Sequence, residues 1–151
     1  MDFHPSAPVA YVLAELSSQI HVFDVDTISG ALSARPGDSL YTSEDQRYHW
    51  SSDIHVTPDG RFVYAVNRDP QQVVAFRVEA NHSLLRLQAT PLTSVVRAFA
   101  VDPGGDYLQI GGEDGRLAAL RIEKDTGALV ESSARTALGR IHTTIIRYLS
   151  P

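Results

Sequence analysis

Short apolar-rich segments separated by turn residues follow one another along the chain. His21–Val25 alternates between polar and apolar residues, and Phe62–Arg68 is rich in Val, Tyr and Phe. Turn tripeptides such as Pro58-Asp59-Gly60 stand between such segments, since proline presets φ and glycine accepts a positive φ. No segment carries a sustained apolar stripe at the 3.6-residue period of a helix. The pattern therefore predicts an all-β chain of short antiparallel strands.

The same order of strands and turns occurs three times. In each unit a proline precedes the second strand, and a charged residue stands ten positions later, where that strand ends. The pairs are Pro5 with Glu15, Pro58 with Arg68, and Pro103 with Glu113. Four-stranded repeats of this length are typical of β-propeller blades. A β-sandwich or an open solenoid of similar strands is the alternative.

We expect a single partial β-propeller domain over residues 1–151. Its three four-stranded blades would cover about residues 1–45, 50–92 and 95–138, and a terminal strand would cover residues 141–148. The segment from Pro36 to Trp50 is polar and lacks the strand pattern. We expect it to be a long irregular loop at the functional face, because loops of this length in compact domains are usually functional or mobile.

Strand register predicts where the charged side chains gather. In an antiparallel pair, the start of the first strand and the end of the second lie at the same edge. The first strand of each propeller blade lies nearest the axis, so this edge rings one mouth of the central channel. Arginines there suit an anionic ligand, and a neighbouring carboxylate suits proton transfer. The residues expected at this mouth are Glu15, Asp53, Arg68, Arg97 and Glu113.

Two further residues adjoin this expected site. His55 belongs to the first strand of the second unit and is expected to point into the channel from beneath. Trp50 stands beside the polar segment. It is either a platform on which a ligand stacks or a packing residue of the rim.

Composition narrows the range of partners and cofactors. The net charge of −5 argues against nucleic acid and against an anionic membrane surface as partners. No run approaches the roughly 18 apolar residues of a transmembrane helix, and the N-terminus lacks a secretory signal pattern, so we expect a cytoplasmic protein. The chain has no cysteine, which excludes disulfides, cysteine-ligated metals and thiolate nucleophiles. Its histidines show no HExxH spacing, and we expect neither a metal nor another cofactor.

Three segments resemble the lactonase family of seven-bladed propellers. The most specific is Trp50–Arg68, which contains Asp53-Ile54-His55 and Thr57-Pro58-Asp59-Gly60-Arg61. Phe3-His4-Pro5 with Glu15-Leu16 resembles an earlier motif of the family, and Arg97–Pro103 resembles a later one. The family includes bacterial 6-phosphogluconolactonase and the fungal carboxy-muconate lactonizing enzyme.

The resemblance implies a reaction and roles for the matching residues. Glu15 and Arg68 would be catalytic, and Arg97, Asp53 and His55 would bind the substrate. Their positions at the expected mouth add Trp50 and Glu113 to the substrate-binding residues. The implied substrate is a small anionic lactone, such as the phosphorylated sugar lactone hydrolysed in the pentose phosphate pathway of glucose metabolism. Reversible lactonization of a muconate is an alternative.

The chain also departs from the family pattern. Ala14, Val96 and Glu113 stand where the family has asparagine, proline and glutamine. The family's chains are about twice as long, and this one resembles their C-terminal half. We therefore expect it either to self-associate or to pair with the missing N-terminal half of the propeller, because isolated blades leave open sheet edges. A noncatalytic propeller fragment that binds a partner is the remaining alternative.

Overall fold

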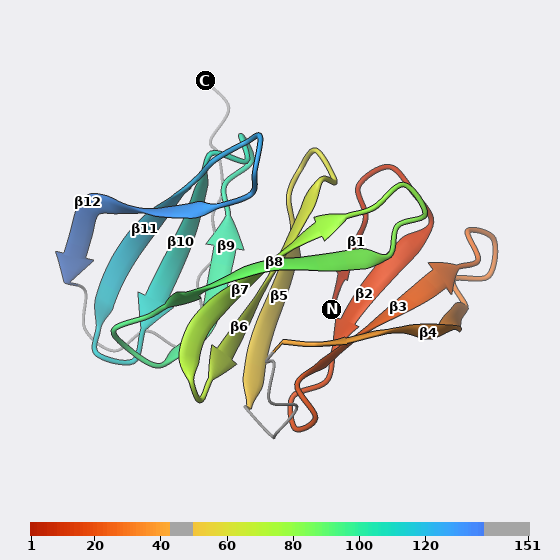
Figure 1. The fold of residues 1–151 in the computed structure, drawn as a ribbon, viewed down its shortest axis with the longest axis horizontal. Helices are drawn as coiled ribbons and strands as arrows, with labels where there is room; N and C mark the ends of the chain where they lie inside the picture. Colours follow the sequence, from red (N-terminus) through yellow and green to blue (C-terminus); the bar gives the residue numbers. More distant parts are fainter. Residues whose placement is uncertain (43–49, 138–151) are drawn as a thin grey trace.

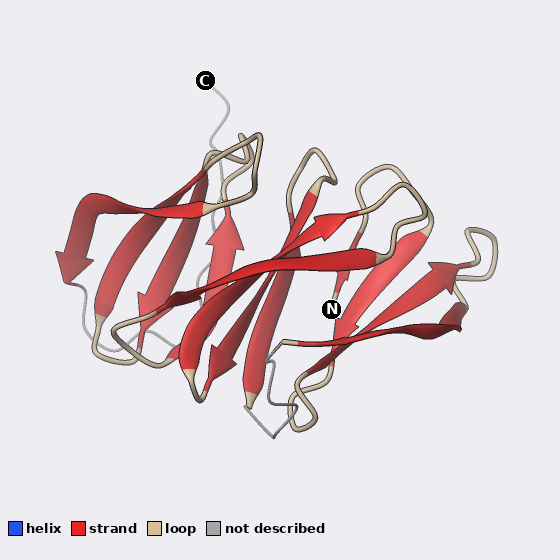
Figure 2. Ribbon diagram, viewed as in Figure 1, coloured by secondary structure: helices blue, strands red, loops and turns tan. Residues whose placement is uncertain are grey.

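A computed structural model describes residues 1–42 and 50–137, with the backbone alone at residues 38–40, 97 and 132–137. The described residues form antiparallel strands and no helix (Figure 2). None of the described segments is thus an apolar helix of membrane-spanning length.

The first sheet contains β1 (Asp2–Phe3), β2 (Val9–Leu13), β3 (Gln19–Val25) and β4 (Leu32–Tyr41). The second contains β5 (Ser51–Val56), β6 (Phe62–Arg68), β7 (Gln71–Val78) and β8 (Leu84–Pro91). The third contains β9 (Val96–Val101), β10 (Tyr107–Gly112), β11 (Arg116–Ile122) and β12 (Leu129–Ala137).

The three sheets follow one another side by side, in chain order (Figure 1). Each is a four-stranded meander in which neighbours in sequence are neighbours in space. The first strands β1, β5 and β9 pack against one another, so they form the common inner edge of the three sheets. This arrangement confirms the predicted all-β fold of propeller blades. The terminal strand expected at residues 141–148 lies outside the described residues.

The core consists of two apolar layers, one on each side of the second sheet. Phe62, Tyr64 and Val66 face the third sheet, where they pack with Phe99 and Leu108. The alternate residues of β6, including Val63 and Ala65, face the first sheet. This alternation follows from the period of a strand, and it explains why β6 is apolar on both faces.

The β4 strand is longer than the sequence pattern predicted. Pro36 was expected to open an irregular loop, but β4 continues to Tyr41, which pairs with Gln19. The register of β3 and β4 shifts between His21 and Phe23, and Gly37 lies close to this shift with a φ of 86°. A β-bulge accommodates Pro36 and the positive φ of Gly37, so strand pairing continues after these residues. Residues 43–49 lie outside the described residues.

Tyr64 provides a test of the contact between the second and third sheets. Its buried hydroxyl donates a hydrogen bond of 2.9 Å to the carbonyl oxygen of Gly127. We expect Tyr64→Phe to lower the free energy of unfolding by about 1–2 kcal/mol, because it leaves a buried carbonyl without its partner. Urea denaturation measures the change. Tyr107→Phe is the control, since Tyr107 is exposed. Equal stability of the unaltered chain and both variants would show that the Tyr64 hydrogen bond does not stabilise the contact between the sheets.

Candidate functional site

Two turns from neighbouring sheets bring a carboxylate and a guanidinium together. Glu15 follows β2 in the turn to β3, and Arg68 ends β6 at the turn to β7. Arg68 Nη2 donates a hydrogen bond to Glu15 Oε1, and the two form an ion pair. The main chain joins the same two sheets, because the amide of Ser51 in β5 donates to the Glu15 carbonyl oxygen at 3.0 Å. The predicted proximity of Glu15 and Arg68 is therefore present in the structure.

The main chain at Trp50 fixes the orientation of Arg68. The carbonyl oxygen of Trp50 accepts hydrogen bonds from the Arg68 amide at 3.1 Å and from Arg68 Nε at 3.0 Å. The guanidinium lies over the indole ring of Trp50, with 5.9 Å from Arg68 Cζ to the ring centroid. The Arg68 side chain is only 14% exposed, whereas that of Glu15 is 63% exposed. Arg68 is thus rigidly held, and the carboxylate beside it remains open to solvent.

A small polar hollow lies at this ion pair. Its volume is about 180 Å³. The residues that line it are Leu13, Glu15, Ser51, Ser52 and Arg68. The hollow therefore combines a carboxylate and a guanidinium from two adjacent sheets, and the guanidinium suits an anionic group of a ligand. The hydroxyls of Ser51 and Ser52 already donate to Asn67 Oδ1 and to the Val96 carbonyl oxygen.

A buried polar cluster supports the hollow. Asn67, next to Arg68, is fully buried, and its Oδ1 accepts hydrogen bonds of 2.7 Å from Thr42 Oγ1 and from Ser51 Oγ. Thr42 in turn donates from its amide to the Ser18 carbonyl oxygen at 2.9 Å. These bonds join the ends of β4 and β6 to the start of β5, so they position the elements that carry the ion pair. Sequence reasoning did not identify this cluster. The only signal is that small polar residues stand where apolar ones would fill the core.

A second charged group lies on the inner strands. His55 Nε2 is 3.3 Å from Asp53 Oδ2, and His55 Nδ1 is 3.6 Å from Asp2 Oδ2. Asp2 comes from β1, and its Oδ2 also accepts a hydrogen bond of 2.8 Å from the Val56 amide. Burial acts to lower the pKa of His55, but the two carboxylates outweigh it and raise the pKa to about 9. His55 is therefore protonated at neutral pH.

This second group also reaches the third sheet. Asp53 Oδ2 accepts a hydrogen bond of 3.2 Å from the Phe99 amide, and the His55 and Phe99 rings meet edge to face at 4.9 Å between centroids. Residues of β1, β5 and β9 are thus held together at the inner edge of the sheets. Asp2 was absent from the predicted site, because β1 is a two-residue strand at the start of the chain.

The His55 cluster predicts a pH dependence of stability. The folded-state pKa of His55 is raised above its ordinary value of 6.5 to about 9. The stabilisation is therefore fully present below pH 6.5 and is lost as the pH rises towards 9. We expect the free energy of unfolding to fall over this interval, as measured by urea denaturation at several pH values. His55→Gln should remove most of this dependence of the free energy of unfolding on pH. If the variant kept the same dependence, a group other than His55 would be responsible for it.

The predicted site residues fall into separate places. Glu15, Arg68 and Trp50 meet at the ends of β2 and β6, whereas His55 pairs with Asp53 and Asp2 on the inner strands. Asp53 was expected beside Glu15 and Arg68, but it is the third residue of β5 and its carboxylate contacts His55.

The third sheet supplies the other two predicted residues. Glu113 follows β10, at the position that corresponds to Arg68 in the second sheet, and its amide donates to the Val95 carbonyl oxygen at 2.9 Å. Arg97 belongs to β9, and its side chain lies outside the described residues. In the described parts of the chain, no group of three or more His, Asp or Glu residues could hold a metal ion.

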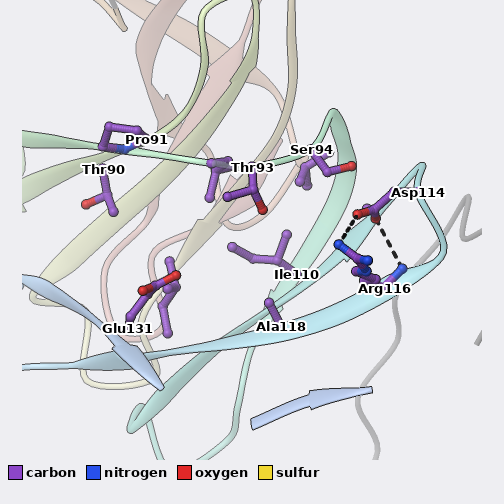
Figure 3. Close-up of a pocket in the computed structure, with 13 residues that line it drawn as sticks. Thr90, Pro91, Thr93, Ser94, Ile110, Asp114, Arg116, Ala118 and Glu131 are labelled. Atoms are coloured by element: carbon purple, nitrogen blue, oxygen red, sulfur yellow. Dashed lines mark hydrogen bonds and ion pairs between the residues drawn. The ribbon is translucent and has the colours of Figure 1, made fainter. Parts of the chain in front are cut away.

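A second hollow lies between the second and third sheets. It measures about 210 Å³ and is lined by Thr90 and Pro91 from the end of β8 together with Ile110 and Ala118 from the third sheet, among others (Figure 3). An Asp114–Arg116 ion pair of 3.8 Å stands at one side of it. Neither residue of the Glu15–Arg68 pair lines this hollow, so it is separate from the candidate site.

Comparisons with known proteins agree with the propeller fold. The family model described as lactonase, 7-bladed β-propeller, matches residues 1–144. The chain is 33% identical over 142 residues to a 6-phosphogluconolactonase of Cronobacter sakazakii, and 30% identical over 141 residues to one of an Enterobacter species. These alignments cover 93% of this chain but 42% and 43% of the relatives.

Solved structures show the same fold. A Bacteroides uniformis protein aligns with a TM-score of 0.83 and 26% identity, over 91% of this chain and 40% of that one. The periplasmic gluconolactonase of Pseudomonas aeruginosa aligns with a TM-score of 0.81 and 24% identity, over 91% of this chain and 39% of that one. The molecule is thus built from lactonase-type propeller blades. The chain belongs to the lactonase family of seven-bladed β-propellers, and it spans less than half the length of the curated relatives it matches.

Proposed function

We propose that this chain carries the proton-transfer and anion-binding part of a lactonase site and acts on a phosphorylated sugar lactone such as 6-phosphogluconolactone. The observation that carries the proposal is the Glu15–Arg68 pair, which joins two blades beside a polar hollow. The relatives named 6-phosphogluconolactonase support this choice of substrate. A guanidinium suits the oxygen of the lactone carbonyl, which becomes negatively charged during hydrolysis.

The geometry supports hydrolysis assisted by Glu15. The exposed Glu15 carboxylate takes a proton from a water molecule, whose oxygen forms a bond to the lactone carbonyl carbon. Arg68 stabilises the negative charge that develops on the carbonyl oxygen. The bond between this carbon and the ring oxygen then breaks, and Glu15 returns its proton to the leaving oxygen. Water and lactone together become the open-chain hydroxy acid.

Arg68 has a donor available for the substrate. Its Nε and Nη2 are occupied by Trp50 and Glu15, whereas Nη1 has no hydrogen-bond partner within residues 1–42 and 50–137. A substrate oxygen in the hollow can accept a hydrogen bond from Nη1 without breaking either contact.

The proposal includes the rest of the propeller as a partner. On the outer face of the first sheet, Phe3 is 50% exposed and Leu32 39% exposed. Such residues favour packing against another blade, supplied either by a second copy or by a separate N-terminal half. Light scattering of the purified chain, alone and mixed with the N-terminal half of a full-length relative, distinguishes the two. A monomer in both samples would contradict this part of the proposal.

Cellular context is also part of the proposal. A cytoplasmic location and a role in the pentose phosphate pathway stay predictions. One protein with this fold is named a periplasmic gluconolactonase, so cell fractionation is the direct test of location.

The proposed function is tested by an assay of proton release, in which the rate of lactone hydrolysis with the chain is compared with the spontaneous rate without it. The substrates are 6-phosphogluconolactone, unphosphorylated gluconolactone and a carboxylated muconolactone. Faster turnover of the phosphorylated sugar lactone supports the proposal. Preference for the muconolactone would indicate the lactonizing activity instead. No turnover by the chain alone or with the N-terminal half of a relative would indicate a noncatalytic binding module.

A further inference from the structure

Trp50 is a large aromatic side chain left in solvent beside the candidate site. It is the only tryptophan of the chain, and the residue is 57% exposed. Tryptophan offers more apolar surface than other side chains and is usually highly buried. A ring that is exposed next to a functional ion pair is therefore available to a ligand.

The contacts of Trp50 hold it in this position without burying its ring. Its backbone adopts a left-handed conformation with a φ of 43°, which is uncommon for a bulky residue. Two hydrogen bonds from Arg68 hold its carbonyl oxygen, and the Arg68 guanidinium lies 5.9 Å from the ring centroid. The main chain is thus fixed by the residue that would bind the substrate anion, while the ring remains accessible.

We propose that Trp50 determines specificity by stacking on the ring of the lactone, an inference that rests on the proposed function. One face of a sugar ring presents C–H groups, which form an apolar patch that suits an indole face. Because the Arg68 guanidinium lies over the indole ring, the sugar ring would stack on the opposite face of the indole, and its anionic group would extend past the edge of the indole towards Arg68. Hydrolysis opens the ring and removes the patch, so the product keeps the contact with Arg68 but loses the contact with Trp50. Trp50 therefore favours the substrate over the product.

A pair of unreactive ligands tests this inference. Glucose 6-phosphate has a closed ring, and glucitol 6-phosphate carries the same phosphate on an open chain. We expect the closed ring to bind about tenfold more tightly to the unaltered chain, in the range of aromatic stacking energies. Calorimetry measures both affinities. Fluorescence provides a second readout from Trp50 alone, and we expect it to change with glucose 6-phosphate more than with glucitol 6-phosphate.

Two variants distinguish stacking from a structural role. Trp50→Ala should lose the tenfold preference and keep its affinity for glucitol 6-phosphate within about twofold, whereas Trp50→Phe should retain most of the preference. With the lactone, Trp50→Ala should raise KM more than it lowers kcat. Thermal unfolding verifies that both variants are folded.

The outcomes separate this inference from the proposed function. Equal affinity of the unaltered chain for the two phosphosugars, or a preference that survives in Trp50→Ala, would overturn the role of Trp50 alone. Failure of the unaltered chain to bind either phosphosugar, together with no lactone turnover, would overturn the proposed function and this inference with it.

Discussion

Replacement of Glu15 by glutamine is expected to lower kcat for lactone hydrolysis by about 100- to 10,000-fold, the usual contribution of a general base. Glutamine keeps the size of the side chain and an oxygen that accepts a hydrogen bond from Arg68, but it cannot take a proton. Initial rates on 6-phosphogluconolactone measure the loss. KM should change little, because Arg68 remains in place.

Glu79→Gln is the matched control for this variant. Glu79 also pairs with an arginine, Arg77, at 2.9 Å, but this pair lies at the turn between β7 and β8, at the opposite edge of the second sheet from Arg68. The control should retain full activity. Equal kcat for Glu15→Gln and the unaltered chain would show that Glu15 moves no proton in the reaction.

Replacement of Arg68 by lysine is expected to lower kcat/KM by about 100- to 1,000-fold, the effect of removing one donor to a developing oxyanion. Lysine keeps the charge but lacks the planar fork, so it cannot reach the Trp50 carbonyl, the Glu15 carboxylate and a substrate oxygen at once. The full dependence of rate on lactone concentration separates the loss in kcat from the rise in KM.

Arg77→Lys is the control for the loss of the guanidinium. Arg77 is 51% exposed and pairs with Glu79 away from the candidate site, so its replacement should leave the kinetics unchanged. If Arg68→Lys behaved like Arg77→Lys, charge alone would be sufficient and the fork geometry would have no role.

The repeat register was enough to predict the contact between Glu15 and Arg68. Both residues stand ten positions after a proline in equivalent units, and equivalent strand ends of adjacent blades lie at the same edge. The same register placed Asp53 at this edge, yet it pairs with His55 further along β5. The register of β5 with β6 shifts between Ser51 and Asp53, and local pattern reading does not reveal such a bulge.

Other features depend on contacts between residues far apart in the sequence. Asp2 reaches His55 and the Val56 amide from a strand that is too short to show a pattern. The Trp50 carbonyl supports Arg68, but backbone groups carry no signature in a sequence. Asn67 is likewise identified only once Thr42 and Ser51 are seen to converge on it. These contacts require the sheets to be placed relative to one another.

If Glu15 of the first blade and Arg68 of the second form one reactive centre, the losses of activity caused by replacing each of them cannot be independent. A double-mutant cycle with Glu15→Gln, Arg68→Lys and the combined variant, read as kcat/KM for 6-phosphogluconolactone, measures this coupling. The expected result is that the combined variant is hardly slower than the more damaged single variant. A combined loss equal to the product of the two single losses would mean that the carboxylate and the guanidinium work separately.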